Sequence, residues 1–275
     1  MDGAAGKIWV VGPIAMDTVV YFKEPIQHGR YVQGFDTEKR IGGSTANVAL
    51  AVVSSGVPTS YVSALGPDKD GTVIRQHLEA AGFKDLLITE TEIDSNQVIV
   101  MVEPDGERTM FGIGPGNLLD ISLKGADLSP RDSVVFVGWH DHFRSDLDYA
   151  RSKGCETFVG IGAVLDPSVI ADVAIGSASD LPAGYALTPP LDRFKRIVMT
   201  QGESGSRQYS QDGMIFQPAI VAEVVDTTGA GDAFLAGYLV EHYRGDIDGR
   251  KSLETGARWA AQMVGVRASV PPPLR

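Results

Sequence analysis

The sequence predicts an α/β protein with a mostly parallel, helix-covered central sheet. Short runs rich in β-branched and aromatic residues alternate with stretches whose apolar residues recur at helical spacing. This alternation is typical of strand–helix–strand units, in which helices cover the faces of parallel strands. The predicted elements are, in order, a strand at 8–11, a helix at 45–55, a strand at 60–64, a helix at 72–82, a strand at 133–138, a helix at 144–153 and a strand at 157–161.

Two segments interrupt this alternation. Residues 17–40 contain short strand-like runs at 18–22 and 31–39, and residues 98–111 read as a hairpin around a Pro-Asp-Gly turn. These runs are too short and too close together for a further strand–helix–strand unit. They are expected to pair as an excursion from the core.

A glycine-rich run at 226–232 predicts a site for a phosphoryl group. It reads Asp-Thr-Thr-Gly-Ala-Gly-Asp, and the apolar residues after it have helical spacing, so its glycines lie where a helix begins. The first amides of a helix lack internal partners and lie at the positive end of its dipole. Gly229, Ala230 and Gly231 would offer amides to a phosphate, and Asp232 could take the proton of an attacking hydroxyl. Alternatively, the run is a turn whose aspartate only favours the helix start.

A second glycine turn, at 41–47, also opens a predicted helix. Gly42 and Gly43 precede its apolar stripe, and Asp17 follows the buried strand at 8–11. The carboxylate of Asp17, the amides of Gly42 and Gly43 and the amide of Asn47 could together bind several hydroxyls of a polyol.

The order of these motifs resembles the ribokinase-like family, also called phosphofructokinase B-type (PfkB) carbohydrate kinases. Further matching motifs lie at 64–71 (Ala-Leu-Gly-Pro-Asp-Lys-Asp-Gly), in the 98–111 hairpin and at 198–205 (Val-Met-Thr-Gln-Gly-Glu-Ser-Gly). Several ordered motifs are much harder to obtain by chance than one. The resemblance implies one domain over 1–275, a ribokinase-like three-layer sandwich. It also implies a small β-sheet lid, formed by about 17–40 and 97–112 and inserted in the α/β core.

The resemblance further implies an ATP- and magnesium-dependent kinase. Its γ-phosphoryl group would pass to a hydroxymethyl group of a sugar or nucleoside, with Asp232 as general base. The other implied site residues are Gly229, Ala230 and Gly231 for the transferring group, Asp17, Gly42, Gly43 and Asn47 for the acceptor, and Thr200, Gly202, Gly205 and Ala268 for the nucleotide.

The resemblance also implies a monovalent cation beside the glycine-rich run at 226–232, which is called the anion turn below. Asp226 and Thr228 resemble positions that hold such an ion in relatives that need potassium. The alternative is that Asp226 caps the turn through its own backbone.

Two departures from the family pattern bear on the metal and the acceptor. Where relatives usually carry an Asn-x-x-Glu motif for magnesium, residues 177–180 read Ser-Ala-Ser-Asp. Asp180 could still hold a hydrated magnesium, which commonly binds through few carboxylates and several waters. Thr200 follows Ser177 by only 23 positions, fewer than a complete helical crossover is expected to need. Ala15 stands where sugar-binding relatives often place an asparagine, which argues against ribose as the acceptor.

Histidines follow the strand at 133–138, in the run Trp139-His140-Asp141-His142. Adjacent residues of an extended chain point to opposite faces, and no further His or Cys lies nearby, so a zinc site is not expected. His140 is a candidate acceptor contact by its place at a strand end, and packing is the alternative. Arg108 in the lid hairpin would either close over an anionic substrate or pair across strands.

Composition excludes several classes of partner. The net charge is −11, and no basic stripe is interleaved with aromatics, so no nucleic-acid partner is expected. No apolar run approaches the roughly 20 residues of a membrane span, so no membrane partner is expected. The first seven residues lack the pattern of a secretion signal, and a cytoplasmic location is expected. Cys155 is the only cysteine, which excludes an intrachain disulfide.

Three questions stay open at this level. A homodimer through the lid is permitted by apolar residues at 19–22, although pairing within one chain explains them equally well. The vitamin kinases of the same fold, acting on pyridoxal or hydroxymethylpyrimidine, are an alternative enzyme class. A catalytically weak sugar- or nucleoside-binding protein is an alternative from another class, suggested by the missing Asn-x-x-Glu motif.

Overall fold

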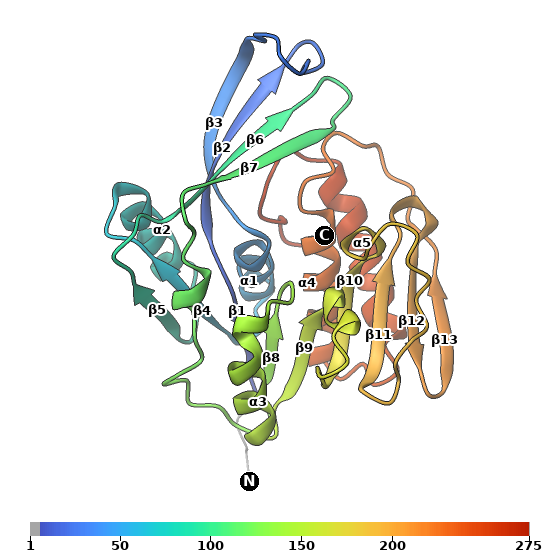
Figure 1. The fold of residues 1–275 in the computed structure, drawn as a ribbon. Helices are drawn as coiled ribbons and strands as arrows, with labels where there is room; N and C mark the ends of the chain where they lie inside the picture. The colour runs from blue at the N-terminus through green and yellow to red at the C-terminus, as the bar shows by residue number, and fades with distance from the viewer. Residues whose placement is uncertain (1–5, 275) are drawn as a thin grey trace.

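The strands form two sheets in the structure, a computed structural model that describes residues 6–274. The predicted single domain over 1–275 therefore includes residues 1–5 and 275, which lie outside the described part. The larger sheet has nine strands and the smaller has four, which stand apart from the layered core (Figure 1). Among the described residues, no helix is long and apolar enough to cross a membrane.

The nine-stranded sheet is mostly parallel, as predicted. Its order is β13-β12-β11-β10-β9-β8-β1-β4-β5, and only β12 and β13 run antiparallel to their neighbours. Strands β1 and β4 are buried along their whole length, as expected for parallel strands covered on both faces. Its strands are β1 (Ile8–Val11), β4 (Thr59–Leu65), β5 (Leu86–Glu90), β8 (Ser133–Phe136), β9 (Glu156–Gly160), β10 (Ala171–Ser177), β11 (Phe194–Thr200), β12 (Ser206–Ser210) and β13 (Gly213–Gln217).

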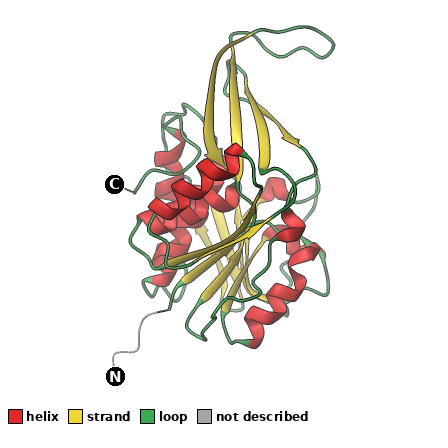
Figure 2. Ribbon diagram, turned by 90° about the vertical axis from the view of Figure 1, so that its left-hand side faces the viewer, coloured by secondary structure: helices red, strands yellow, loops and turns green. Residues whose placement is uncertain are grey.

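Helices cover both faces of this sheet, which gives the predicted three layers (Figure 2). Apolar residues of α1, α2, α4 and α5 join the core on one face, whereas α3 packs on the other. The α-helices among residues 6–274 are α1 (Ser44–Ser54), α2 (Lys69–Ala80), α3 (Arg144–Ser152), α4 (Ala230–Tyr243) and α5 (Arg250–Val264). Two crossovers on the α3 face have only 3-10 turns, at Ile161–Leu165 and Ala178–Asp180.

The smaller sheet joins the two predicted excursions into one lid. Strand β2 (Ala15–Phe22) pairs antiparallel with β3 (Gly34–Gly42) and parallel with β6 (Asn96–Val102), which pairs antiparallel with β7 (Arg108–Ile113). The parallel pairing of β2 with β6 places residues 17 and 98 side by side. Strand β2 begins just beyond the end of β1, so the lid rises from the carboxyl edge of the large sheet.

Some boundaries differ from the prediction for local reasons. Strand β3 begins at Gly34 and not at 31, because pairing with β2 begins at Phe22 and Gly34, and Tyr31 lies 86% exposed in the connecting loop. Helix α2 begins three residues earlier than predicted because the Asp68 side chain accepts a hydrogen bond from the Gly71 amide and caps it. Strand β8 ends before Gly138, whose positive φ of 76° is incompatible with a strand.

Candidate active site

The two glycine turns lie side by side at the starts of α1 and α4, which pack against each other. Gly43 (φ 94°) precedes α1, and Gly229 (φ 71°) precedes α4, so both turns open helices as predicted. The Asn47 side chain donates a hydrogen bond from Nδ2 to Oδ2 of Asp232 at 2.7 Å. Two motifs 185 residues apart in the chain thus share one contact.

Asp232 is a half-buried carboxylate at this junction. Burial raises its pKa to about 6, because water no longer solvates the charged form fully. Hydrogen bonds from Asn47 and Ser44 and the charge of Arg108 lower the pKa, while the charge of Asp180 raises it. A carboxylate with a pKa of about 6 is mostly ionised at neutral pH and can accept a proton.

Asp17 lies at the base of the lid, against Gly42 on the neighbouring strand. A Cβ atom on Gly42 would lie 1.9 Å from Oδ2 of Asp17, so only glycine allows this carboxylate its position. Asp17 is buried, which raises its pKa to about 6, and the charge of Arg40 opposes the rise. Arg40 is the residue directly opposite Asp17 on β3.

The anion turn itself is held in place by close packing on the C-terminal segment. A Cβ atom on Gly229 would lie 2.8 Å from the carbonyl oxygen of Ser269, and its left-handed φ also favours glycine. The Ala230 amide makes a long bond of 3.4 Å to the Thr227 carbonyl. The amides at the start of α4 therefore make at most weak hydrogen bonds within the turn and can donate to a bound anion.

Asp226 precedes this turn and is buried. Its Oδ1 accepts hydrogen bonds from the Thr228 amide at 2.8 Å and the Thr228 hydroxyl at 2.5 Å, which is the turn-capping arrangement weighed from the sequence. Its Oδ2 is also buried but has no hydrogen-bond partner among residues 6–274, and the same holds for the Ser269 hydroxyl. Two buried oxygens near one turn thus remain free to ligate a cation.

A cavity of about 760 Å³ lies next to the anion turn. It includes Thr200, Gly202 and Gly205, which were predicted to contact the nucleotide, together with Ala230 and Gly231. Its size is suited to a ligand of a few hundred daltons. Ala268 does not line this cavity and packs against the core instead.

The apolar wall of this cavity was not predicted from the sequence. Ile220, Val221 and Val224 line it from a loop, and α5 adds Ala257 and Ala260. Val221 is 99% exposed and Val224 60%, and exposed apolar residues grouped in this way are more typical of a ligand-binding surface than scattered ones are. The only signal in the sequence was a run of aliphatic residues without strand or helix neighbours.

Arg108 reaches this cavity from the lid. Its Nη2 lies 3.4 Å from the Thr227 hydroxyl, and the residue lines the cavity beside Gly231. It also pairs across strands with Val102. The structure thus places the Arg108 guanidinium at the anion turn as well as in the lid sheet.

The loop after β10 confirms the short crossover that its spacing suggested. Ser177 and Asp180 form a capping box around one 3-10 turn, in which the Ser177 amide donates to Oδ2 of Asp180 at 2.8 Å. Residues 181–193 then reach β11 without a helix. In the described part of the chain, no group of three or more His, Cys, Asp or Glu side chains is placed to hold a metal ion.

His140 caps the short turn after β8. Its Nδ1 accepts a hydrogen bond from the His142 amide at 3.1 Å, and its side chain is exposed. It does not line the 760 Å³ cavity. A contact of His140 with an acceptor stays a prediction.

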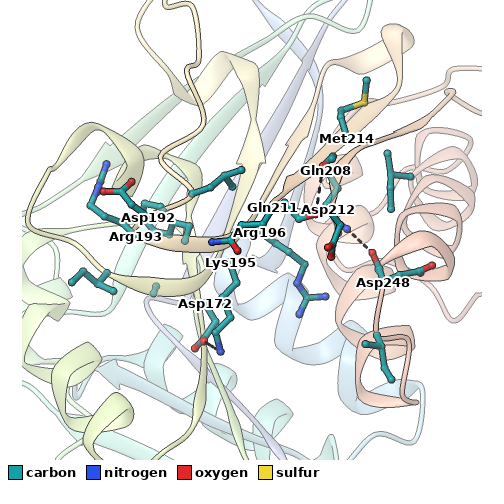
Figure 3. A pocket seen from close by; sticks show the side chains of 18 of the residues that line it. Asp172, Asp192, Arg193, Lys195, Arg196, Gln208, Gln211, Asp212, Met214 and Asp248 are labelled. Atoms are coloured by element: carbon teal, nitrogen blue, oxygen red, sulfur yellow. Dashed lines mark hydrogen bonds and ion pairs between the residues drawn. The ribbon is translucent and has the colours of Figure 1, made fainter.

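A larger cavity of about 890 Å³ lies at the opposite edge of the sheet, among β10 to β13 and the α4–α5 connection (Figure 3). Two of the basic side chains that line it are paired with carboxylates: Lys195 lies 2.7 Å from Asp172, and Arg196 lies 2.9 Å from Glu156. None of the predicted site residues lines it. The chemistry of the glycine turns therefore marks the smaller cavity as the candidate active site.

Known proteins resemble this chain over most of its length. The model of the family described as "pfkB family carbohydrate kinase" matches residues 5–144 and 186–273. A 1-phosphofructokinase of Haloferax volcanii is 27% identical, covering 94% of this chain and 91% of that protein. A fructokinase of Klebsiella pneumoniae is 26% identical, covering 85% of this chain and 83% of that protein.

Solved structures show the same fold. The ribokinase of Giardia lamblia has a TM-score of 0.83 at 18% identity, covering 98% of this chain and 97% of that one. The Arabidopsis thaliana ribokinase complexed with ribose and ATP has a TM-score of 0.78 at 22% identity, covering 97% and 95%. These likenesses confirm the predicted ribokinase-like sandwich with its lid.

The family match confirms the class of enzyme that the motifs predicted, a phosphotransferase with an alcohol acceptor. The stretch that it leaves unmatched, 145–185, includes the rebuilt loop at 177–180. The match nevertheless covers both glycine turns and the lid. The chain therefore belongs to the pfkB family of carbohydrate kinases.

Proposed function

We propose that the protein transfers the γ-phosphoryl group of ATP to a hydroxymethyl group of a sugar or nucleoside, with Asp232 as general base. The observation that carries this proposal is the position of Asp232. It lies at the start of α4, beside the amides of the anion turn, and is bonded to Asn47 of the acceptor motif. The proposed general base and the amides that would bind the phosphoryl group are thus adjacent at the start of α4.

In the proposed reaction, the acceptor oxygen attacks the γ-phosphorus while its proton passes to Asp232. The bond between the γ-phosphorus and the β–γ bridging oxygen breaks, and ADP leaves with the electron pair. Gly229, Ala230 and Gly231 donate amides to the transferring group, and Arg108 adds positive charge at Thr227. These groups favour the transition state because negative charge accumulates on the transferring oxygens.

The acceptor would lie between the lid and α1. Asp17 provides charged acceptor oxygens for hydroxyl groups, and the amides of Gly42 and Gly43 and the side chain of Asn47 complete the set. Buried polar groups of this kind discriminate strongly, since a ligand without the matching hydroxyl leaves them unpaired.

The nucleotide would occupy the 760 Å³ cavity. Thr200, Gly202 and Gly205 lie at its phosphate end, and the wall of Ile220, Val221 and Val224 suits a flat base. Asp180 would hold hydrated magnesium through the carboxylate oxygen that its capping box leaves unused. That ion would neutralise phosphate oxygens.

We include a monovalent cation such as potassium at Asp226. The unpartnered Oδ2 of Asp226 and hydroxyl of Ser269 support this assignment, because buried polar oxygens are rarely left without a partner. A cation there would add positive charge beside the anion turn.

A homodimer through the outer face of the lid is also proposed. Of the four residues at 19–22, Val19, Tyr21 and Phe22 are buried within this one chain. Phe111 and Ile113 of β7 instead expose about half of their surfaces, 49% and 48%. A molecular mass of two chains in light scattering, reduced to one chain by Phe111→Asp, would support the dimer, and a single-chain mass in the wild type would contradict it.

The function is tested by ATP-dependent ADP release over a panel of acceptors. The panel contains ribose, fructose, their 1-phosphates, nucleosides, pseudouridine and pyridoxal, with magnesium and with or without potassium. Turnover of a sugar or nucleoside supports the proposal, and turnover of pyridoxal alone assigns the vitamin branch. Thermal stabilisation by a sugar without any ADP release would indicate a binding protein.

A further inference from the structure

One arginine of the lid, Arg40, keeps two guanidinium nitrogens without a hydrogen-bond partner. Its Nε and Nη2 are both buried, and neither is bonded to another atom within residues 6–274. Buried donors are rarely left in this state, because removal from water costs free energy that a hydrogen bond must offset. A guanidinium cannot avoid this cost by releasing a proton. This part of the side chain is therefore a candidate for binding a ligand.

The two unpartnered nitrogens form one edge of the planar guanidinium. Nε–H and Nη2–H point the same way, a geometry that matches the two oxygens of a carboxylate or a phosphate. The remaining nitrogen is held, since Nη1 of Arg40 donates to Oε1 of Glu38 at 3.1 Å. The same Oε1 accepts a hydrogen bond from the Tyr21 hydroxyl at 2.9 Å. Glu38 thus fixes the guanidinium through the nitrogen that the unpartnered edge does not use.

Arg40 lies beside the carboxylate that was assigned to the acceptor. In the register of β2 and β3 it is directly opposite Asp17, so both side chains project from the same face of the lid sheet. No ion pair joins the two residues in the described chain, where the carboxylate paired with Arg40 is that of Glu38. The charge of Arg40 nevertheless lowers the pKa of Asp17, as expected for neighbouring groups. Both side chains can therefore contact one acceptor.

We propose that Arg40 selects an acceptor that carries an anionic group in addition to the hydroxyls bound by Asp17. The chemical class is a polyol with a phosphate ester or a carboxylate, two of whose oxygens accept from Nε–H and Nη2–H of Arg40. This inference rests on the proposed function and narrows its acceptor.

The phosphates of ATP do not account for this edge of Arg40. The nucleotide cavity is lined by Arg108 and not by Arg40, and the anion turn offers its own amides there. Arg267 adds positive potential beside Arg40, because its guanidinium lies 5.2 Å over the ring of Tyr21. In a chain with a net charge of −11, arginines gathered at one place favour an anion locally.

The first experiment measures kcat/KM for three pairs of acceptors that differ in the anionic group. The pairs are fructose 1-phosphate and fructose, ribose 1-phosphate and ribose, and gluconate and glucitol, and every compound keeps a free hydroxymethyl group. We expect wild type to prefer the anionic member of at least one pair by about 100-fold, because the neutral member leaves the buried donors unpaired. A preference only for phosphates assigns the phosphate ester, and one only for gluconate assigns the carboxylate. A neutral member used equally well or better in all three pairs would overturn the inference.

Two substitutions of Arg40 test whether it carries this preference. Arg40→Gln should lower kcat/KM for the anionic acceptor about 100-fold and leave that for the neutral one within about threefold. Arg40→Lys keeps the charge but not the two-pronged edge, so it should lose about tenfold. The lysine variant keeps the test decisive if Arg40→Gln does not fold. An unchanged preference in Arg40→Gln, or in Arg40→Lys in that case, would overturn the inference.

Lys39→Gln is the matched control. It removes the same charge from the adjacent residue, whose side chain projects from the other face of β3 and lies 3.3 Å from Asp70. The wild-type preference should remain in this variant. A loss of preference as large as that of Arg40→Gln would show that overall charge, and not the edge of Arg40, attracts the anion, and would overturn the inference.

Calorimetry of the same pairs without ATP separates this inference from the proposed function. Tighter binding of the anionic member to wild type, lost in Arg40→Gln and kept in Lys39→Gln, supports the anionic ligand. If no acceptor is phosphorylated, that result removes the kinase assignment alone. Conversely, turnover that Asp232→Asn abolishes, with equal affinity for both members of every pair, upholds the proposed function and removes this inference.

Discussion

The anion turn at 226–232 and the loop at 177–180 both use an aspartate to cap a turn, but they leave that aspartate in different states. Asp226 is buried, spends one oxygen on Thr228 and keeps the other without a partner in the described chain. Asp180 is exposed and closes a capping box with Ser177. The first arrangement leaves a desolvated oxygen that only a ligand would satisfy, whereas solvent satisfies the second.

This difference indicates where the chain depends on bound groups. Burying a polar group without a partner costs on the order of 1–3 kcal/mol, so the anion-turn side retains a cost that folding alone does not require. The 177–180 loop carries no such cost. We therefore expect substitutions around the glycine turns to have large effects on activity and those in the loop to have small ones.

Apart from the loss of the base itself, the largest of these effects is expected at the acceptor carboxylate. Asp17→Ala should lower kcat/KM for the acceptor by about 100- to 1,000-fold, since it removes charge-assisted bonds to substrate hydroxyls. The affinity for ATP, measured by calorimetry, should stay within about twofold, because the nucleotide occupies a separate cavity. Equal losses for both ligands would contradict this division.

Gly42→Ala is expected to act through Asp17. The added Cβ would lie 1.9 Å from the Asp17 carboxylate and must displace it, which should cost roughly 1–3 kcal/mol of stability and about 10- to 100-fold in activity. Gly162→Ala is the control, because nothing lies within 4 Å of its added Cβ. Urea unfolding and acceptor kinetics of both variants test the expectation, and a Gly42→Ala protein as active as Gly162→Ala would refute it.

The two buried carboxylates should also make stability depend on pH. Burial raises the pKa of Asp17 and Asp232 to about 6, above the ordinary aspartate value of 3.8, so between about pH 4 and 6 the folded protein holds protons that the unfolded chain has lost. The free energy of unfolding from these groups therefore falls as pH rises through this window. In Asp232→Asn, the free energy of unfolding should fall less between pH 4.5 and 7 than in wild type, by about 1–3 kcal/mol at most, as measured by urea unfolding. Identical declines in both proteins would contradict the raised pKa.

Removing the charge of Asp226 tests whether its unpartnered Oδ2 binds a cation. Asp226→Asn should abolish any activation by potassium and lower kcat several-fold, because the amide no longer attracts a cation. Sodium and caesium titrations of wild type serve as the ionic-strength control. A potassium response that survives in the variant would place the cation elsewhere.

The smallest effect is expected in the loop. Asp180→Asn should keep the capping acceptor and raise the KM for magnesium ATP by no more than about threefold, since magnesium is held mainly by phosphates and waters. A loss comparable to that of Asp17→Ala would show that the loop contributes as much as the anion turn, and the comparison would fail.

The fold was predictable from local patterns wherever those patterns were strong. Apolar runs such as 8–11 and the helical stripe after Gly43 identified β1 and α1 nearly to the residue. The partners of the strands were not predictable, because the pairing of β2 with β6 joins residues about 80 positions apart. Strands β5, β12 and β13 were missed, since they lie at or next to an edge of the sheet, are partly exposed and lack a continuous apolar run.

The candidate site was predictable in its residue types and less so in its contacts. The motifs identified Asp17, Asn47 and Asp232, but only the packing of α1 on α4 shows that Asn47 bonds to Asp232. Ala268 is partly buried against the core and does not line the 760 Å³ cavity, so its expected contact with the nucleotide stays a prediction. Such contacts depend on tertiary distances that one sequence does not encode locally.

The most direct test of the account compares acceptor-dependent ADP release by wild type and Asp232→Asn, using whichever acceptor the panel identifies. Binding of ATP and acceptor to both proteins is measured alongside. We expect turnover to fall by about 1,000-fold or more while both ligands still bind, because only the proton acceptor has been lost. Turnover by Asp232→Asn at the wild-type rate would contradict the account, since the two glycine turns would then share a contact without sharing the chemistry.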